Sequence, residues 1–162
     1  MSSRTSLTVW ALIVLLSSET GEAAILTFTN VEAGADYAAA DNWDLSRVPT
    51  GTDDAVVGGA GTTRSAVHST SSGFTAHDLW VGAGAGGVGS LTLDGGAGTL
   101  IFDGGTWPNG VHIGRDGGSG TVTINAGGLI STNGDIGLGS KDGGAGNSGS
   151  TGEVVFAGQT MA

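Results

Sequence analysis

Apolar and polar residues alternate along this chain in short runs, and Gly-rich turns separate the runs. A period of two residues is typical of β-strands with one buried face, and helical periodicity is nearly absent after the first 23 residues. The pattern therefore predicts an all-β protein. The expected strands are Ile25–Thr29, Asp54–Gly58, Asp78–Gly82, Gly89–Asp94, Thr99–Asp103, Gly110–Gly114, Thr121–Asn125, Leu129–Thr132, Asp135–Gly139 and Glu153–Ala157.

One strand pattern occurs three times at nearly constant spacing. It reads GSLTLDGG, then GTVTINAG, then GEVVFAG. Leu91, Val122 and Val154 hold matching places in the three copies, and they are 31 and 32 residues apart. A single copy has too few apolar residues to close a core of its own, so the copies must stack and share one. We expect a right-handed parallel β-helix (a β-solenoid) rather than a meander of antiparallel hairpins.

Alternation also predicts which side chains share the interior. In a strand, neighbouring side chains point to opposite faces. Four outward positions align between copies: Trp80 with His112, and Thr92 with Thr123. These four form a candidate contact face, or they merely stack on one another. The expected interior residues are Leu79, Val81, Leu91, Leu93, Leu100, Phe102, Val111, Ile113, Val122, Ile124, Ile136, Leu138, Val154 and Phe156.

Residues 1–23 have the pattern of a cleaved secretory signal peptide. Arg4 supplies a positive start, Leu7–Leu16 is an apolar run, and Gly21 and Ala23 fit the −3 and −1 positions of a cleavage site. A membrane anchor is the alternative, but ten apolar residues extend only about 15 Å as a helix, half of a hydrocarbon core. No other apolar stretch is long enough to cross a bilayer. The mature chain is expected to begin near Ala24.

The rest of the chain divides into residues 24–76, an N-terminal cap with a first coil, and residues 77–162, the β-helix repeats. A first coil needs a cover for its apolar interior. Trp43 is a plausible plug and Pro49 a rigid turn into the first stacked strand. Stacking of Trp43 on a ligand is the alternative. Lys141–Ser148 is expected to lengthen a turn by insertion.

Composition excludes several classes of partner and fold. The chain has 33 Gly and no Cys, so an exported form is held by its core and strand pairing rather than by disulfides. Its formal net charge is −10. Only Arg47, Arg64, Arg115 and Lys141 remain basic after cleavage, too few for a nucleic-acid or anionic-lipid surface.

The stretch from Leu79 to Ala162 resembles the Gly-rich repeats of autotransporter (type V secretion) passengers and of exosortase-sorted (PEP-CTERM) bacterial surface proteins. The matching segments read VGAGAGGVGSLTLDGG, IGRDGGSGTVTINAGGLIS, IGLGS and SGSTGEVVFAG, and the NW, VP and DDAVV segments before them resemble the usual opening. The resemblance implies a right-handed parallel β-helix on the outside of a bacterium, and it supplies no catalytic residues. Because no sorting tail or barrel strands precede Met161-Ala162, we expect a fragment with an open C-terminal coil.

Candidate chemistry is sparse. Glycoside cleavage needs two carboxylates about 5 to 10 Å apart, and the available residues, Asp78, Asp94, Asp103, Asp116 and Asp135, mostly fall at strand ends where a turn explains them. A His77–Asp78 dyad is not expected, because adjacent strand residues face opposite ways. With no Cys and no pair of His at ligand spacing, no zinc or redox-metal site is indicated.

Calcium is the remaining metal. Asp116–Gly120 and Asp142–Gly146 are similar to calcium-binding Gly-Asp turns, but the GGxGxD pattern lacks its Asp at both Gly95 and Gly117. Weak incidental Ca²⁺ binding stays open, and no cofactor is expected.

These patterns together predict an exported, non-enzymatic β-solenoid stalk, secreted or on the bacterial surface. Its expected partners are extracellular polysaccharide or cell-surface ligands. The alternative is a fragment of a carbohydrate-active β-helix, similar to polysaccharide lyases or hydrolases, with its catalytic coils elsewhere.

Overall fold

The computed structural model describes residues 23–69, 74–94, 99–102, 110–125, 129–132, 134–139 and 149–158. These residues form strands joined by turns, with one short 3-10 helix, η1 (Ala40–Asn42), so the predicted all-β class is confirmed. Several predictions concern residues outside the described part of the chain. They are the signal peptide except Ala23, Asp103, the Leu100 and Phe102 side chains, the Lys141–Ser148 insertion and the Asp142–Gly146 turn. Within the described part, no helix has the length and apolar character to cross a bilayer.

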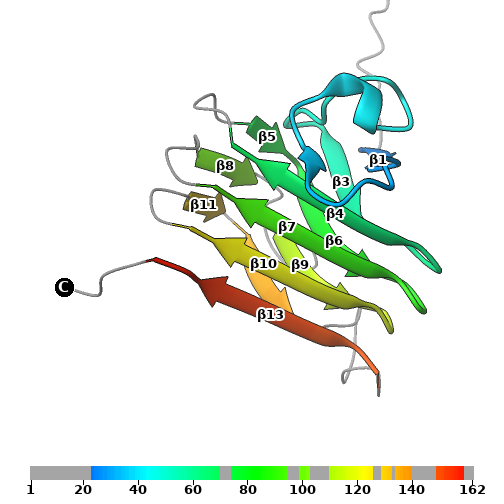
Figure 1. Ribbon diagram of the computed structural model, residues 1–162, viewed down its shortest axis with the longest axis vertical. Coiled ribbons are helices and arrows are strands. Elements are labelled where there is room, and N and C mark those ends of the chain that lie inside the picture. Colours follow the sequence, from blue (N-terminus) through cyan, green and yellow to red (C-terminus); the bar gives the residue numbers. More distant parts are fainter. Residues whose placement is uncertain are drawn as a thin grey trace, which may run out of the picture.

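The strands form three parallel sheets (Figure 1). The first sheet contains β1 (Ala24–Thr27), β3 (Asp53–Val57), β6 (Asp78–Ala83), β9 (Gly110–Arg115) and β12 (Asp135–Leu138) in that order. The second contains β2 (Ala35–Asp36), β4 (Thr63–His68), β7 (Val88–Leu93), β10 (Ser119–Ile124) and β13 (Thr151–Phe156). The third contains β5 (Phe74–Ala76), β8 (Thr99–Phe102) and β11 (Leu129–Thr132).

The chain visits the three sheets in a fixed order. It passes from β3 to β4 to β5, then from β6 to β7 to β8, then from β9 to β10 to β11. Each passage thus adds one strand to each sheet, beside the strand of the previous passage. In Figure 1 the strands β4, β7, β10 and β13 lie one beneath the other.

The strand register follows the sequence repeat. Val122 pairs with Leu91 on one side and with Val154 on the other, both in parallel strands. This pairing confirms the predicted parallel stacking of the copies and excludes a meander there. Elsewhere the spacing is shorter: Ala66 pairs with Leu91, only 25 residues away. The turns therefore differ in length while the strands keep their register.

The interior is built mainly from the residues that alternation predicts. Leu79, Val81, Leu91, Leu93, Val111, Ile113 and Val122 are 0% exposed, and Ile124 is 8% exposed. The prediction is wrong for Ile136, Leu138 and Phe156, which are 51–67% exposed. They lie on β12 and β13, the outermost strands of their sheets, where no further described strand covers them. Val154 is partly buried against the core.

The glycine that begins each sequence copy lies where the first and second sheets meet. A Cβ on Gly120 would lie 2.1 Å from the Val81 carbonyl oxygen and 2.6 Å from the Gly114 nitrogen. Gly82, at the end of the first-sheet strand, has φ +69°, and its Cβ would lie 1.9 Å from the Ser119 oxygen. Both positions exclude every other residue, because backbone atoms of the other sheet occupy the space that a side chain would need. Equivalent contacts recur at Gly58, Gly89, Gly114 and Gly152.

An aromatic cluster packs against the first strands of the stack. Trp43 is 2% exposed and makes edge-to-face contacts with Phe28 and Tyr37, at ring-centroid distances of 5.2 and 4.9 Å. Its indole Nε1 donates a hydrogen bond to the Tyr37 carbonyl oxygen at 2.9 Å. Trp43 therefore has the packing expected of a plug, and it presents no ring face to a ligand.

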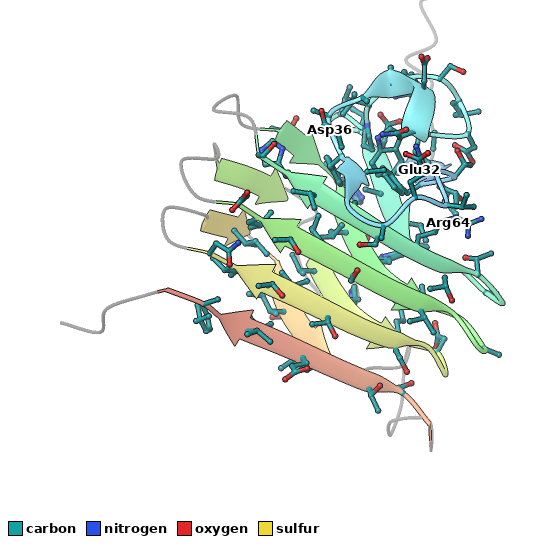
Figure 2. All side chains as sticks on the ribbon, viewed as in Figure 1. Glu32, Asp36 and Arg64 are labelled. Carbon is teal, nitrogen blue, oxygen red and sulfur yellow. The ribbon has the colours of Figure 1, made fainter. Side chains whose placement is uncertain are left out.

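Three charged residues, Glu32, Asp36 and Arg64, lie at one end of the molecule (Figure 2). Glu32 and Asp36 are exposed, and Arg64 donates to the Thr63 carbonyl oxygen.

Candidate functional site

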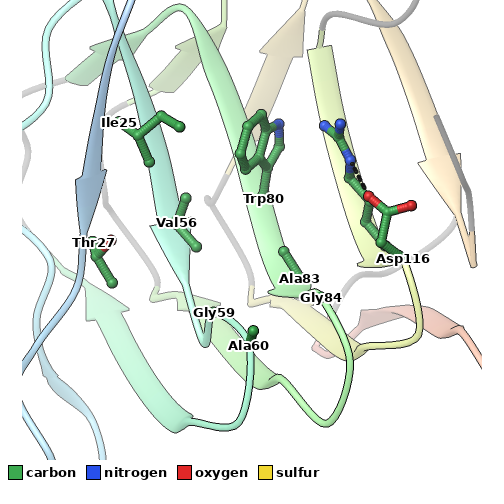
Figure 3. A pocket seen from close by; sticks show the side chains of 10 residues that line it. Ile25, Thr27, Val56, Gly59, Ala60, Trp80, Ala83, Gly84 and Asp116 are labelled. Carbon is green, nitrogen blue, oxygen red and sulfur yellow. Dashed lines mark hydrogen bonds and ion pairs between the residues drawn. The ribbon is translucent and has the colours of Figure 1, made fainter.

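A groove of about 290 Å³ runs over the outer face of the first sheet (Figure 3). Trp80 is one of the residues that line it. On the β1 and β3 side the lining residues are Ile25, Thr27 and Val56, and Val56 is the register partner of Trp80. The other lining residues are Gly59, Ala60, Ala83, Gly84, Arg115 and Asp116.

The local sequence explains why Trp80 faces outward. Leu79 and Val81 on either side of it are fully buried in the core, so alternation places the indole on the opposite face of β6. The groove is hollow because the residues that follow β3 and β6, such as Ala60 and Gly84, carry small side chains or none. The result is a large aromatic ring beside an open, mostly apolar trough.

Arg115 and Asp116 complete one side of the groove. The Arg115 guanidinium carbon lies 4.3 Å from the centre of the Trp80 ring, a cation–π contact. The Arg115 Nε donates to the Asp116 Oδ2 at 3.0 Å. The Trp80 indole Nε1 is buried and has no hydrogen-bond acceptor among the described residues. The ring is therefore held by stacking and packing.

The structure does not unite the four predicted contact residues. Trp80 and His112 are register partners on the first sheet, and Thr92 and Thr123 are register partners on the second. The two threonines are partly exposed. The pairings of the two ladders are confirmed, but the ladders occupy different faces.

The prediction that His112 is available for contact is wrong, because its side chain is 0% exposed. Val111 and Ile113 are in the core, so His112 does lie on the outer side of β9. Alternation fixes the side of a sheet that a residue faces, but it does not say whether other parts of the chain cover that side. Of the first-sheet pair, only Trp80 remains a contact candidate.

A second cluster lies on the same face of the first sheet, two residues before Val56 and Trp80 on their strands. Asp54 and Asp78 are register partners on β3 and β6, and His77 precedes β6 directly. The His77 Nδ1 lies 2.9 Å from the Asp54 Oδ1 and 3.7 Å from the Asp78 Oδ1. The backbone N–H of Gly110 donates to the Asp78 Oδ1 at 2.7 Å.

Burial raises the pKa of the Asp78 carboxyl above its ordinary value. The Gly110 N–H opposes this increase in pKa, and the Asp54 carboxylate adds to it. Asp78 is therefore a carboxyl group whose charged form is disfavoured by its surroundings.

The sequence argument missed this cluster. It did not expect a His77–Asp78 dyad, on the ground that adjacent strand residues face opposite ways. His77 in fact precedes the strand, and its Nδ1 lies 2.9 Å from the Asp54 carboxylate and 3.7 Å from the Asp78 carboxylate. The contact with Asp54 spans 23 residues of sequence. The only available signal was that Asp54 and Asp78 each begin a strand pattern of the form D-apolar-x-V.

The other predicted acidic residues are dispersed. Asp94 follows β7 and accepts a hydrogen bond from the side-chain amide of Asn125, which follows β10, at 3.1 Å. Asp116 is engaged by Arg115, and Asp135 is exposed on β12.

Comparison with protein-family models, with curated proteins and with solved structures finds no match for this chain. The functional argument therefore rests on the groove and on the side chains that line it.

Proposed function

We propose that this chain is an exported, non-catalytic right-handed parallel β-helix that binds neutral extracellular polysaccharide in the groove beside Trp80. The single observation that carries the proposal is an outward tryptophan, braced by Arg115 at 4.3 Å, beside an apolar trough on a rigid sheet. An indole face is a favourable partner for the apolar C–H face of a pyranose ring. Because stacked strands hold the ring, little conformational freedom is lost on binding.

The solenoid form of the proposal is supported by the regular passage between three parallel sheets. Crossover connections between parallel strands are right-handed in nearly all known cases, which favours that hand here. The similarity to bacterial surface repeats and the signal-peptide pattern support a position outside the cell, secreted or on the surface.

Charge supports a neutral ligand. The chain carries a formal net charge of −10, which repels polyanions at long range. Inside the groove the Arg115 charge is balanced by Asp116. A chain of neutral hexoses is not repelled by the net negative charge, and it does not need an unpaired cation in the groove.

Binding without cleavage is favoured over the carbohydrate-active alternative. Asp54 and Asp78 are neighbouring carboxyl groups on this face, with ligand atoms within 4.8 Å of one another. A glycosidase needs carboxyl groups about 5 to 10 Å apart, one on each side of an accessible sugar bond. The Asp78 side chain is 4% exposed, which suits a structural or metal-binding role better than contact with a polymer.

The test is a glycan array of neutral and acidic polysaccharides probed with the chain and with Trp80→Ala. We expect binding to neutral glycans that weakens more than about tenfold, or about 1.4 kcal/mol, in the variant. Trp80→Tyr should restore much of it, because the aromatic face returns.

Thr92→Ala/Thr123→Ala is the matched control, since it alters the outer face of the second sheet. Loss of binding in this control with none in Trp80→Ala would refute the groove assignment. Release of reducing ends from the bound glycan would favour the enzymatic alternative.

A further inference from the structure

The cluster of Asp54, His77 and Asp78 gathers three metal-ligating atoms in one place. One nitrogen and two carboxylate oxygens lie within 4.8 Å of one another. Two of the separations are 2.9 Å, from His77 Nδ1 to Asp54 Oδ1, and 3.7 Å, from His77 Nδ1 to Asp78 Oδ1. The three residues come from the starts of two neighbouring strands.

These separations are close to those of atoms that share one metal ion. Zinc binds histidine nitrogen and carboxylate oxygen at about 2.0–2.2 Å in tetrahedral geometry, so two atoms bound to one ion lie about 3.3–3.6 Å apart. The two measured separations, 2.9 and 3.7 Å, lie on either side of this range and within about half an ångström of it. Side-chain adjustments of that size would bring the three atoms to bonding positions around one ion.

The charge balance of the cluster also favours a cation. The neighbouring carboxylate, Asp53, is neutralised by a two-point ion pair with Arg47. Asp54 and Asp78 have no Lys or Arg partner in the part of the chain described here. Two carboxylates on adjacent strands, both largely removed from water, repel each other, and a divalent ion would offset that repulsion.

We propose that Asp54, His77 and Asp78 bind one divalent transition-metal ion, with Zn²⁺ as the probe. The imidazole nitrogen favours Zn²⁺ over Ca²⁺ and Mg²⁺, which prefer all-oxygen sites. Three protein ligands leave at least one position for water. The His77 side chain is 33% exposed, which gives the ion a path from solvent. This site is independent of the polysaccharide groove.

The experiment is calorimetric titration of the untagged, chelator-treated chain with Zn²⁺ at pH 7, with a thermal melt in parallel. We expect a stoichiometry of one and a Tm that rises by several degrees with excess Zn²⁺. Asp54→Asn, His77→Gln and Asp78→Asn should each weaken binding by about tenfold or more. Asn at position 78 keeps an oxygen for the Gly110 N–H, so loss of binding there reports on the metal rather than on that hydrogen bond.

Glu32→Gln, at an exposed carboxylate outside the cluster, is the matched control and should bind Zn²⁺ like the parent. Circular dichroism and metal-free melts of each variant separate loss of binding from loss of folding. The proposal is overturned if Zn²⁺ does not bind with a stoichiometry of one, or if the three variants bind it as the parent does. It is also overturned if Ca²⁺ binds at these residues as tightly as Zn²⁺.

Discussion

At the scale of single residues, Asp53 shows how this acidic chain keeps a carboxylate ionised inside its fold. The residue is 2% exposed, and it accepts hydrogen bonds from the Arg47 guanidinium and from the backbone N–H and hydroxyl of Thr50. The Arg47 hydrogen bond is the main reason that the pKa of Asp53 lies far below its ordinary value. A lowered carboxyl pKa stabilises the fold above the unfolded-state pKa of about 3.9, and this contribution is lost as the pH falls through the folded-state value.

Arg47→Met should therefore lower the free energy of unfolding at pH 7, because the buried Asp53 carboxylate loses its charged hydrogen-bond partner, and the exposure of Arg47 to solvent limits the size of this loss. The difference from the parent should shrink as the pH falls from about 4 toward 2, because the parent then loses the same stabilisation. Urea unfolding in the presence of a chelator, at a series of pH values, measures it. Arg64→Met is the control. An equal difference at every pH would contradict the assigned role of Asp53.

Residue-scale features differ in how far the sequence reveals them. The outward position of Trp80 follows from alternation, since its neighbours Leu79 and Val81 are apolar. The burial of His112 does not follow, because alternation fixes only the side of the sheet that a residue faces and not how far it is exposed. The approach of His77 to Asp54 depends on the conformation of a residue just outside a strand, where the two-residue period gives no guidance.

At the scale of elements, the line along which the first two sheets meet allows the least choice of residue, because glycine is required there. The chain turns there at Gly82 and at its equivalents, and the next strand begins on a glycine that touches backbone. Repetition of glycine at the start of GSLTLDGG, GTVTINAG and GEVVFAG therefore has a steric cause. The repeated glycine can be recognised in the sequence alone, but the close backbone contact that requires it is visible only in the structure.

Gly120→Ala should destabilise the fold by about 3 kcal/mol or more, because the added methyl lies 2.1 Å from a carbonyl oxygen that strand pairing fixes in place. Gly51→Ala is the matched control. Its Cβ would have only ordinary contacts, 3.7 Å and longer, with Thr75, so its stability should stay near that of the parent. Thermal and urea unfolding of both variants test this. Equal stability of Gly120→Ala and Gly51→Ala would show that the sheets do not meet as described.

The strands that the sequence failed to predict also have a physical explanation. β4 (Thr63–His68) places Ala66 and His68 in the interior, both 0% exposed, where a strand pattern normally shows large aliphatic side chains. On the neighbouring strand β7, the register partners of Ala66 and His68 are Leu91 and Leu93, which are also fully buried. The aliphatic residues that reveal an interior row thus lie on β7, while β4 contributes an alanine and a histidine to the same rows, so β4 alone does not display the pattern.

At the scale of the whole molecule, residues of all three parallel sheets contribute to one hydrophobic core, and the outer faces of the sheets lie on the surface. The first sheet carries both the Trp80 groove and the Asp54–His77–Asp78 cluster, whereas the second carries the Thr92–Thr123 ladder. The parallel stacking and its register could be predicted from the 31- and 32-residue spacing of Leu91, Val122 and Val154. The separation of the two ladders could not, because it depends on which strands share a sheet.

The central functional claim is that the Trp80 groove is the surface that meets a glycan. Indole N–H resonances in a ¹⁵N-labelled chain, titrated with a neutral hexose oligosaccharide, test it most directly, because each tryptophan gives its own signal. The account predicts that the Trp80 resonance, assigned with Trp80→Phe, shifts in a saturable manner while that of the buried Trp43 does not move. A Trp80 signal that stays in place while the oligosaccharide binds, or a shift confined to other tryptophans, would contradict it.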